Sequence, residues 1–338
     1  MIFVIWMIAV YYIPFCQDGP IIYPLEVSAN LCRTNLAPMF LLLANYFQTY
    51  HEYCNLWLWY LYVDWQLFLI TPFLILIFIK SKKIGLICIG ILALSSFIYQ
   101  FIFFQFINKS DPSNNDITFK NDYYMQPYGR CNTYFIGIIC CLIYLSSANR
   151  KLISFQSEYL DYINQLFKRR IARYLVYLIG IFLSVFFIFA QNIFDHSSSR
   201  LPQIYCTIYL LFYRIGFTFG VALLIYPSIQ GYNRIFKPIF THPIFNILGK
   251  LTYGCYLIHV LVFQTLLAKV MNNRYFNFWI YLMDTIFGFC FAYLFSFVAG
   301  LLFETPIAQI SKTLISQLSI TQRKTEKIQK VNNNDKDA

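Results

Sequence analysis

Residues 56–79 read LWLWYLYVDWQLFLITPFLILIFI, an apolar run that carries one charge, Asp64. A helix rises 1.5 Å per residue, so about 20 apolar residues cross the ~30 Å hydrocarbon core of a bilayer. The strands of a transmembrane barrel alternate apolar and polar residues, and this stretch does not. The stretch therefore predicts a membrane-spanning helix and an all-α fold.

The composition of the whole chain agrees with this reading. Of the 338 residues, 59% are hydrophobic and only 12% are charged, whereas a soluble domain carries roughly 25% charge. A water-soluble fold is excluded, and so is disorder over most of the length. The formal net charge of +11 would suggest a nucleic-acid partner in a soluble protein. Here we expect membrane lipids as partners and no nucleic acid.

Similar apolar runs recur along the chain and predict a polytopic transmembrane helix bundle of about eight spans over residues 1–310. A basic, polar tail follows over 311–338. The first span competes with a signal peptide, but no basic segment precedes it and no small-residue cleavage site follows; a truncated helix is the better interpretation. The expected spans are 1–15, 56–79, 84–107, 129–148, 174–192, 204–228, 248–270 and 277–303.

Basic residues predict the orientation, because Lys and Arg accumulate in cytosolic segments. With Met1 in the cytosol, 18 of the 26 basic residues lie in or beside cytosolic segments and seven on the opposite side. Loops 16–55 and 108–128 are then lumenal or extracellular, and the tail is cytosolic. The membrane is an endomembrane or the plasma membrane.

Four of the ten cysteines lie at or beyond the lumenal edge: Cys16, Cys32, Cys54 and Cys131. This compartment permits disulfides. Cys32 and Cys54 both lie in loop 16–55, which we call the outer loop, so they are the natural pair. No cysteine or histidine spacing typical of zinc accompanies them, and we expect no metal. A glycosylation sequon begins at Asn108, at the membrane edge.

Four ionisable residues fall inside expected spans: Asp64, Arg214, His259 and Asp284. Such residues are costly in a membrane and are functional candidates. One interpretation is a polar chamber in which His259 is a base and Arg214 holds an anionic group. The other is structural: a carboxylate neutralises Arg214, and His259 hydrogen-bonds a neighbouring helix. Arg130 at the lumenal boundary either contacts substrate or extends to the headgroups.

Several sequence blocks resemble the integral-membrane acyltransferase 3 family, in particular the branch named after the nose resistant to fluoxetine proteins. They occur in family order and cover roughly residues 10–306. The blocks are Cys32-Arg33-Thr34-Asn35 with Asn45-Tyr46-Phe47 and Cys54; Leu58-Trp59-Tyr60-Leu61 with Val63-Asp64-Trp65-Gln66-Leu67-Phe68 and Thr71-Pro72; Gln126-Pro127-Tyr128-Gly129-Arg130 with Tyr134-Phe135-Ile136-Gly137-Ile138; Tyr213-Arg214; Leu248-Gly249-Lys250-Leu251-Thr252-Tyr253 with Tyr256-Leu257-Ile258-His259; and Phe303-Glu304-Thr305-Pro306.

The resemblance implies transfer of an acyl group, other than aminoacyl, from acyl-CoA to a lipid, sugar or other acceptor at or across the membrane. Acyl-CoA would be a co-substrate, and no tightly bound cofactor is expected. The residue pattern and the blocks together give two sets of candidate site residues. His259 and Asp64 are catalytic candidates, and the substrate-binding candidates are Arg214, Arg130, Tyr128, Gln66 and Tyr253.

The sequence departs from the family in one respect, because the family's first helices carry an arginine and a histidine considered central to catalysis. The matched region starts after them, so the chain is expected to be either a partial sequence or a shortened paralogue without activity. A lipid or small-molecule (xenobiotic) transporter is the alternative function, with the polar chamber as the substrate path.

The predicted orientation can be tested by labelling engineered cysteines at Ser81 and Ser198 with a membrane-impermeant reagent. We expect the two sites to react from opposite sides of the membrane, because basic segments flank the first and not the second. Labelling of both sites from the same side would contradict the number of helices between them.

Overall fold

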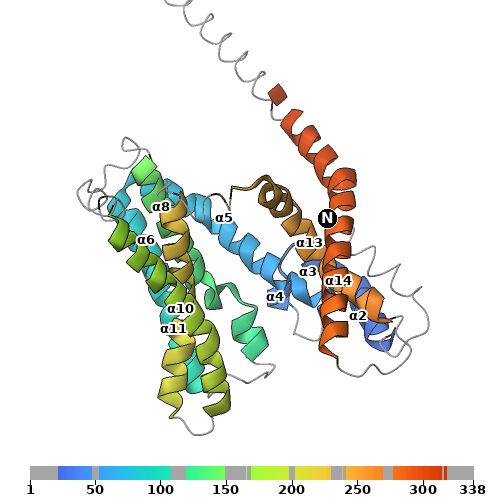
Figure 1. The fold of residues 1–338 in the computed structure, drawn as a ribbon, viewed down its shortest axis with the longest axis horizontal. Helices are drawn as coiled ribbons and strands as arrows, with labels where there is room; N and C mark the ends of the chain where they lie inside the picture. The colour runs from blue at the N-terminus through green and yellow to red at the C-terminus, as the bar shows by residue number, and fades with distance from the viewer. Residues whose placement is uncertain are drawn as a thin grey trace, which may run out of the picture. The chain divides into compact units, whose positions relative to one another are not determined.

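The computed structural model describes residues 22–47, 53–107, 119–148, 165, 169–197, 202–229, 238, 241–268, 277–313 and 316–317. The expected first span, the sequon at Asn108, Cys16 and most of the tail lie outside these ranges. In the described ranges the regular elements are helices, and no strand occurs among them (Figure 1). The predicted all-α fold is confirmed.

Six helices in the described part of the chain are long and apolar enough to cross a membrane. Each overlaps a span expected from the sequence, and a shorter apolar helix occupies Cys131–Leu142. The chain is therefore a multi-pass membrane protein. The six candidate spans are Leu56–Lys80, Lys82–Ile107, Arg170–Ala190, Gln203–Ile229, Pro243–Gln264 and Phe278–Thr313.

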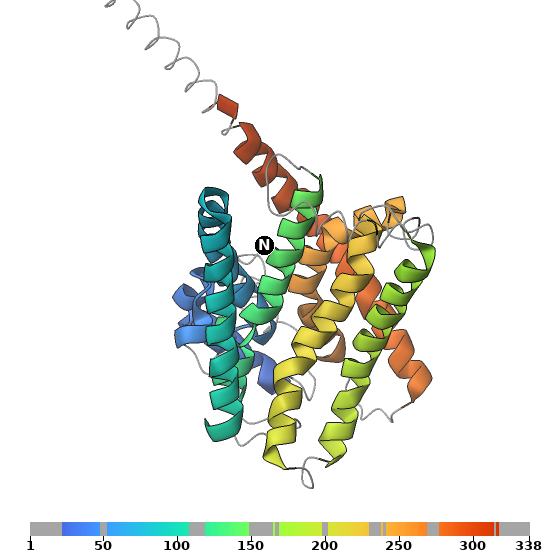
Figure 2. The same ribbon diagram turned by 90° about the vertical axis from the view of Figure 1, so that its left-hand side faces the viewer.

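The chain divides into two compact units, and the larger one comprises Asn35–His242. Its long helices pack in the order α5, α6, α8, α11, α10. Figure 2 shows the last four side by side, coloured from cyan through green to yellow. Their bounds are α5 (Trp59–Lys80), α6 (Lys82–Ile102), α8 (Cys131–Ala148), α10 (Arg170–Ser197) and α11 (Gln203–Ile229).

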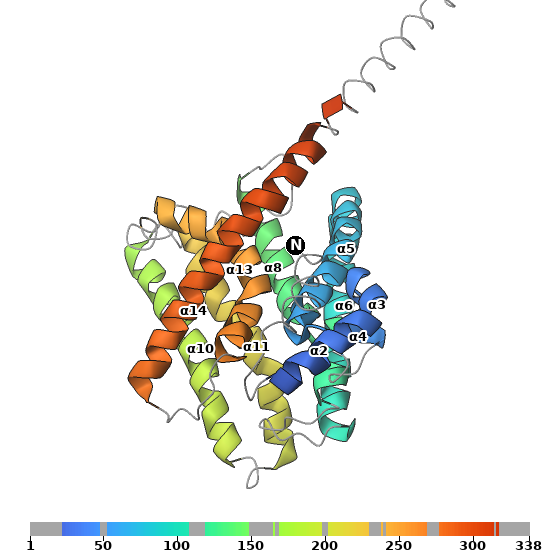
Figure 3. The same cartoon turned by 90° about the vertical axis from the view of Figure 1, so that its right-hand side faces the viewer.

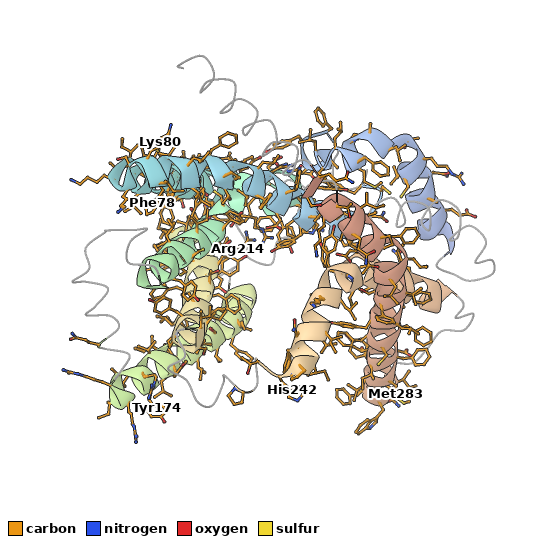
Figure 4. The ribbon with its side chains drawn as sticks, turned by 90° about the horizontal axis from the view of Figure 1, so that it is seen from above. Phe78, Lys80, Tyr174, Arg214, His242 and Met283 are labelled. Carbon is orange, nitrogen blue, oxygen red and sulfur yellow. The ribbon has the colours of Figure 1, made fainter. Side chains whose placement is uncertain are left out.

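A tight connection joins α5 to α6. Ser81 alone separates the two helices, in an extended conformation. A Cβ atom on Gly85 would lie 2.5 Å from the Cα of Phe78, so only glycine lets the two backbones approach this closely. Figure 4 labels Phe78 and Lys80 at this end of α5. The two helices therefore meet closely where α5 ends and α6 begins.

The second unit comprises residues 1–34 and 243–338. Its long helices, α13 (Pro243–Ala268) and α14 (Phe278–Ala299), pack against each other (Figure 3). Two contacts between them are close: the Ser296 hydroxyl donates to the carbonyl of Leu251 at 2.8 Å, and Gly288 faces the ring of Phe263. Beyond α14 the chain continues through a π-helical turn, Gly300–Glu304.

The outer loop carries three short helices, α2 (Ile22–Thr34), α3 (Leu36–Phe40) and α4 (Ala44–Phe47). Cys32 in α2 and Cys54 form a disulfide, as the sequence predicts. Both side chains are buried. The disulfide closes the loop between positions 32 and 54, and in the chain-entropy model such a closure stabilises a fold by about 3 kcal/mol. Cys131, which the sequence also places at the lumenal edge, is a free thiol.

Three side-chain amides connect the outer loop to the helices, and we call Asn45, Gln66 and Gln126 the amide cluster. The amides of Asn45 and Gln66 exchange hydrogen bonds of 3.1 and 2.8 Å. Gln66 Nε2 also donates to the carbonyl of Leu42 at 2.9 Å, and Gln126 Nε2 donates to the carbonyl of Asn45 at 2.7 Å. Leu42 is in the left-handed region, with φ 58°, which costs a non-glycine residue roughly 1–2 kcal/mol.

The amide cluster predicts an asymmetry between single and double substitutions. Gln66→Met leaves the buried amide of Asn45 without its partner, so we expect the free energy of unfolding to fall by about 1–3 kcal/mol. The double variant Asn45→Leu/Gln66→Met removes both amides and should lose less. Melting of the purified protein in detergent measures both. A double variant less stable than the single would contradict this account of the cluster.

Candidate functional site

Arg214 lies on α11, among the helices of the larger unit (Figure 4). Its Nε donates to the hydroxyl of Tyr213, and its Nη1 donates to the carbonyl of Gly129 at 3.3 Å. Its guanidinium carbon is 4.8 Å from the ring centroid of Tyr123. The partners are therefore a hydroxyl, a carbonyl and a ring face, all of them neutral.

Arg130 follows a short 3-10 turn, Pro127–Gly129, and directly precedes α8. Its Nε donates to the carbonyl of Tyr124 at 3.1 Å. Its guanidinium carbon is 4.3 Å from the ring centroid of Tyr124 and 4.8 Å from that of Trp59. These distances are typical of cation–π contacts, so two rings and a backbone carbonyl hold this side chain.

Tyr124 connects the two arginines, because its ring centroid is also 5.7 Å from the guanidinium carbon of Arg214. We call Arg130 and Arg214 the arginine pair. Burial lowers the pKa of Arg130 below its ordinary value, and the positive charge of Arg214 lowers it further. In the described part of the chain, no carboxylate forms an ion pair with either residue. The site therefore presents two positive charges that the described residues do not neutralise.

Two π-helical turns, Phe103–Ile107 and Lys120–Tyr124, carry the aromatic rings next to the arginine pair. Tyr123 is 0% exposed and stacks on Phe103 with ring centroids 5.6 Å apart. Burial raises the pKa of Tyr123 above its ordinary value, so its hydroxyl stays protonated. π-helical turns are rare and occur frequently at functional sites.

Of the other predicted residues in this unit, Tyr128 packs on α6. Its ring meets that of Tyr99 at 4.5 Å, and its carbonyl accepts from Ser96 at 2.6 Å. Gln66 belongs to the amide cluster, where hydrogen bonds occupy both ends of its amide. Asp64 is exposed on α5, and among the described residues no ion pair joins it to Arg214.

The remaining two predicted residues, His259 and Tyr253, lie on α13 in the other unit. His259 Nδ1 is 2.5 Å from the carbonyl oxygen of Tyr256, one turn earlier. A carbonyl only accepts hydrogen bonds, so Nδ1 carries a proton, and the tautomer that fits this contact has its lone pair on Nε2. Tyr253 is exposed.

Sequence reasoning missed the aromatic partners of the arginine pair. Trp59, Tyr123 and Tyr124 are not among the site residues that the sequence predicts. One available signal was the pair of adjacent tyrosines shortly before Arg130 in an otherwise polar segment. Rings so close in sequence to an arginine favour a cation–π site.

Comparison with known proteins shows the family to which this helical membrane protein belongs. The acyltransferase domain family matches residues 1–301, and the chain is a member of that family. It is also similar to nose resistant to fluoxetine protein 6 of Caenorhabditis elegans, at 23% identity over 317 residues. The match covers 89% of this chain and 37% of that relative's length. No solved structure matches the chain.

The ring shared by the arginine pair predicts a difference between two substitutions of Tyr124. Tyr124→Phe keeps the ring face and should leave stability almost unchanged. Tyr124→Leu removes it from both guanidinium groups, and we expect a further loss of about 1–2 kcal/mol in the free energy of unfolding. Melting in detergent compares the two variants. Equal losses would show that the ring face does not hold the arginines.

Proposed function

We propose that the protein transfers an acyl group from acyl-CoA to an acceptor hydroxyl at the membrane. Family membership supports a membrane acyltransferase in general. One observation supports a charged substrate at this site: two neighbouring arginines hold positive charge that no described carboxylate neutralises. Such a site favours a substrate that brings its own negative charge.

The proposed base is His259, whose Nε2 keeps its lone pair because Nδ1 faces the Tyr256 carbonyl. Nε2 accepts the proton of the acceptor hydroxyl as that oxygen attacks the thioester carbonyl of acyl-CoA. The carbon–sulfur bond then breaks, and the sulfur leaves as the thiol after taking the proton from the imidazolium. An ester and free CoA result, so the step balances without oxidant or metal. General-base catalysis of this kind contributes about 10²–10⁴-fold.

Asp64, the second catalytic candidate, and Tyr253, a substrate-binding candidate, are each proposed to act on substrate from their own unit of the chain. Both are exposed on long helices, α5 and α13, so a substrate can reach them. Gln66 and Tyr128 are proposed to position neighbouring groups, because the amide of Gln66 is fully paired and Tyr128 packs on Tyr99. These residues should affect transfer less than His259 does.

Replacing His259 tests the proposed base. His259→Asn places an amide N–H near the position of Nδ1 and can keep the hydrogen bond to Tyr256, but it has no basic nitrogen. We expect it to lower the rate of acyl transfer by about 100-fold or more, with the folded yield unchanged. The assay measures CoA thiol released from a labelled acyl-CoA by the purified protein in vesicles of native membrane lipid.

Two further outcomes separate the alternatives. Thiol release that survives His259→Asn would remove this residue from the chemistry. Accumulation of labelled lipid or small molecule inside the vesicles, with no thioester cleavage by the wild-type protein, would contradict the enzyme and support a transporter. Asp64→Asn serves as the matched substitution of an exposed ionisable residue and should reduce transfer only a few-fold.

A further inference from the structure

Several buried polar atoms in the segment that contains Arg130 have no hydrogen-bond partner in the described part of the chain. They belong to one short segment, residues 123–132. Tyr123 and Asn132 are almost fully buried, with 0% and 8% of their surfaces exposed. The atoms are the Tyr123 hydroxyl, Gln126 Oε1, Arg130 Nη2, and both Nδ2 and Oδ1 of Asn132.

Leaving these groups unpaired is costly, because each buried donor or acceptor without a partner costs roughly 1–3 kcal/mol. Buried polar groups in proteins are paired as a rule, and exceptions need an explanation. At the arginine pair itself the unpaired groups are the Tyr123 hydroxyl and the Arg130 Nη2 group, and both can donate a hydrogen bond. Donors around two cations match a ligand that is rich in acceptor oxygens and negatively charged.

The charge of the site indicates which class of anion it binds. Two guanidinium groups contribute two positive charges, and their described partners are rings, a hydroxyl and carbonyls, which compensate neither. A carboxylate supplies one negative charge. A phosphate monoester supplies between one and a half and two at pH 7, with three acceptor oxygens, and guanidinium is well suited to bind it.

The position of Arg130 indicates from which side the ligand comes. Arg130 precedes α8, whereas the basic segment 149–173 follows the other end of that helix. In the orientation expected from the basic residues, Arg130 is on the lumenal or extracellular side. Acyl-CoA is a cytosolic donor, so the ligand that reaches Arg130 from its own side is the acceptor.

We infer that the arginine pair binds a phosphate ester carried by the acceptor and does not bind the phosphates of acyl-CoA. The assignment of this ligand to the acceptor, and not to the acyl donor, rests on the proposed function. Its core, a phosphate site at Arg130 and Arg214, stands on the unpaired donors and the uncompensated charges alone. The phosphate ester is a lipid headgroup or a water-soluble molecule.

Binding measurements on the purified full chain in detergent test the inference. The probes are dioctanoyl phosphatidic acid, dioctanoyl phosphatidylcholine, glycerol 3-phosphate and CoA. We expect phosphatidic acid to bind the wild type and to raise its Tm, and phosphatidylcholine, whose headgroup has no net charge, to bind at least about 10-fold more weakly. Arg130→Gln and Arg214→Gln should weaken phosphatidic acid binding by about 30-fold or more, the loss for a buried charge pair.

Two controls accompany these variants. Arg170→Gln removes an exposed arginine at the start of α10 and should leave phosphatidic acid binding unchanged. Arg130→Lys keeps the charge but loses the planar fork, so it should bind with intermediate strength even if Arg130→Gln does not fold. CoA binding should be the same in Arg130→Gln as in the wild type.

The outcomes are distinct from those of the transfer assay. Glycerol 3-phosphate binding as tightly as phosphatidic acid supports the phosphate ester and assigns a water-soluble acceptor. CoA binding lost in parallel with phosphatidic acid binding would overturn the inference, because the pair would then serve the donor. Equal binding of phosphatidylcholine and phosphatidic acid would also overturn it. Charge-dependent binding without any thioester cleavage would leave the phosphate site standing and refute the proposed transfer.

Discussion

The larger unit is organised around two positive charges that no described carboxylate neutralises. Bringing a guanidinium group into a membrane domain is costly unless its N–H groups and its charge meet partners. Arg130 and Arg214 meet backbone carbonyls, one hydroxyl and ring faces. These partners satisfy some donors and attract the charge through their dipoles and quadrupoles, but they do not cancel it. The net charge therefore remains available to an incoming anion.

Holding the arginine pair requires a backbone that regular α-helix does not supply. The π-helical turn Lys120–Tyr124 directs Tyr123 and Tyr124 toward the guanidinium groups. A second π-helical turn, Phe103–Ile107, lies behind it, and Gln203 Nε2 donates to two of its carbonyls, those of Phe104 and Gln105. In the amide cluster, Gln126, four residues before Arg130, donates a hydrogen bond to Asn45 in the outer loop.

The sequence predicted the spans well, because long apolar runs have one stable solution in a bilayer. It did not predict which face each polar side chain occupies. Asp64 shares a helical face with Tyr60 and Phe68, and all three are exposed; in a helix as uniformly apolar as α5, no amphipathic pattern separates the buried face from the exposed one. Gln66, two residues on, points to a different face and pairs with Asn45. That contact joins residues 21 positions apart, and local pattern carries no information about it.

The charge of the arginine pair also links ligand binding to stability. A ligand that binds the folded chain and not the unfolded one stabilises it by RT ln(1 + [L]/Kd), about 2.7 kcal/mol at 100 times Kd. Two like charges beside one ring repel each other, and unpaired donors such as the Tyr123 hydroxyl add to the cost of the site without ligand. An anion reduces the repulsion between the arginines and also pairs with the donors, whereas a neutral molecule only pairs with the donors. If the arginine pair binds an anion as proposed, selectivity against neutral lipids would follow from the energetics of the site itself.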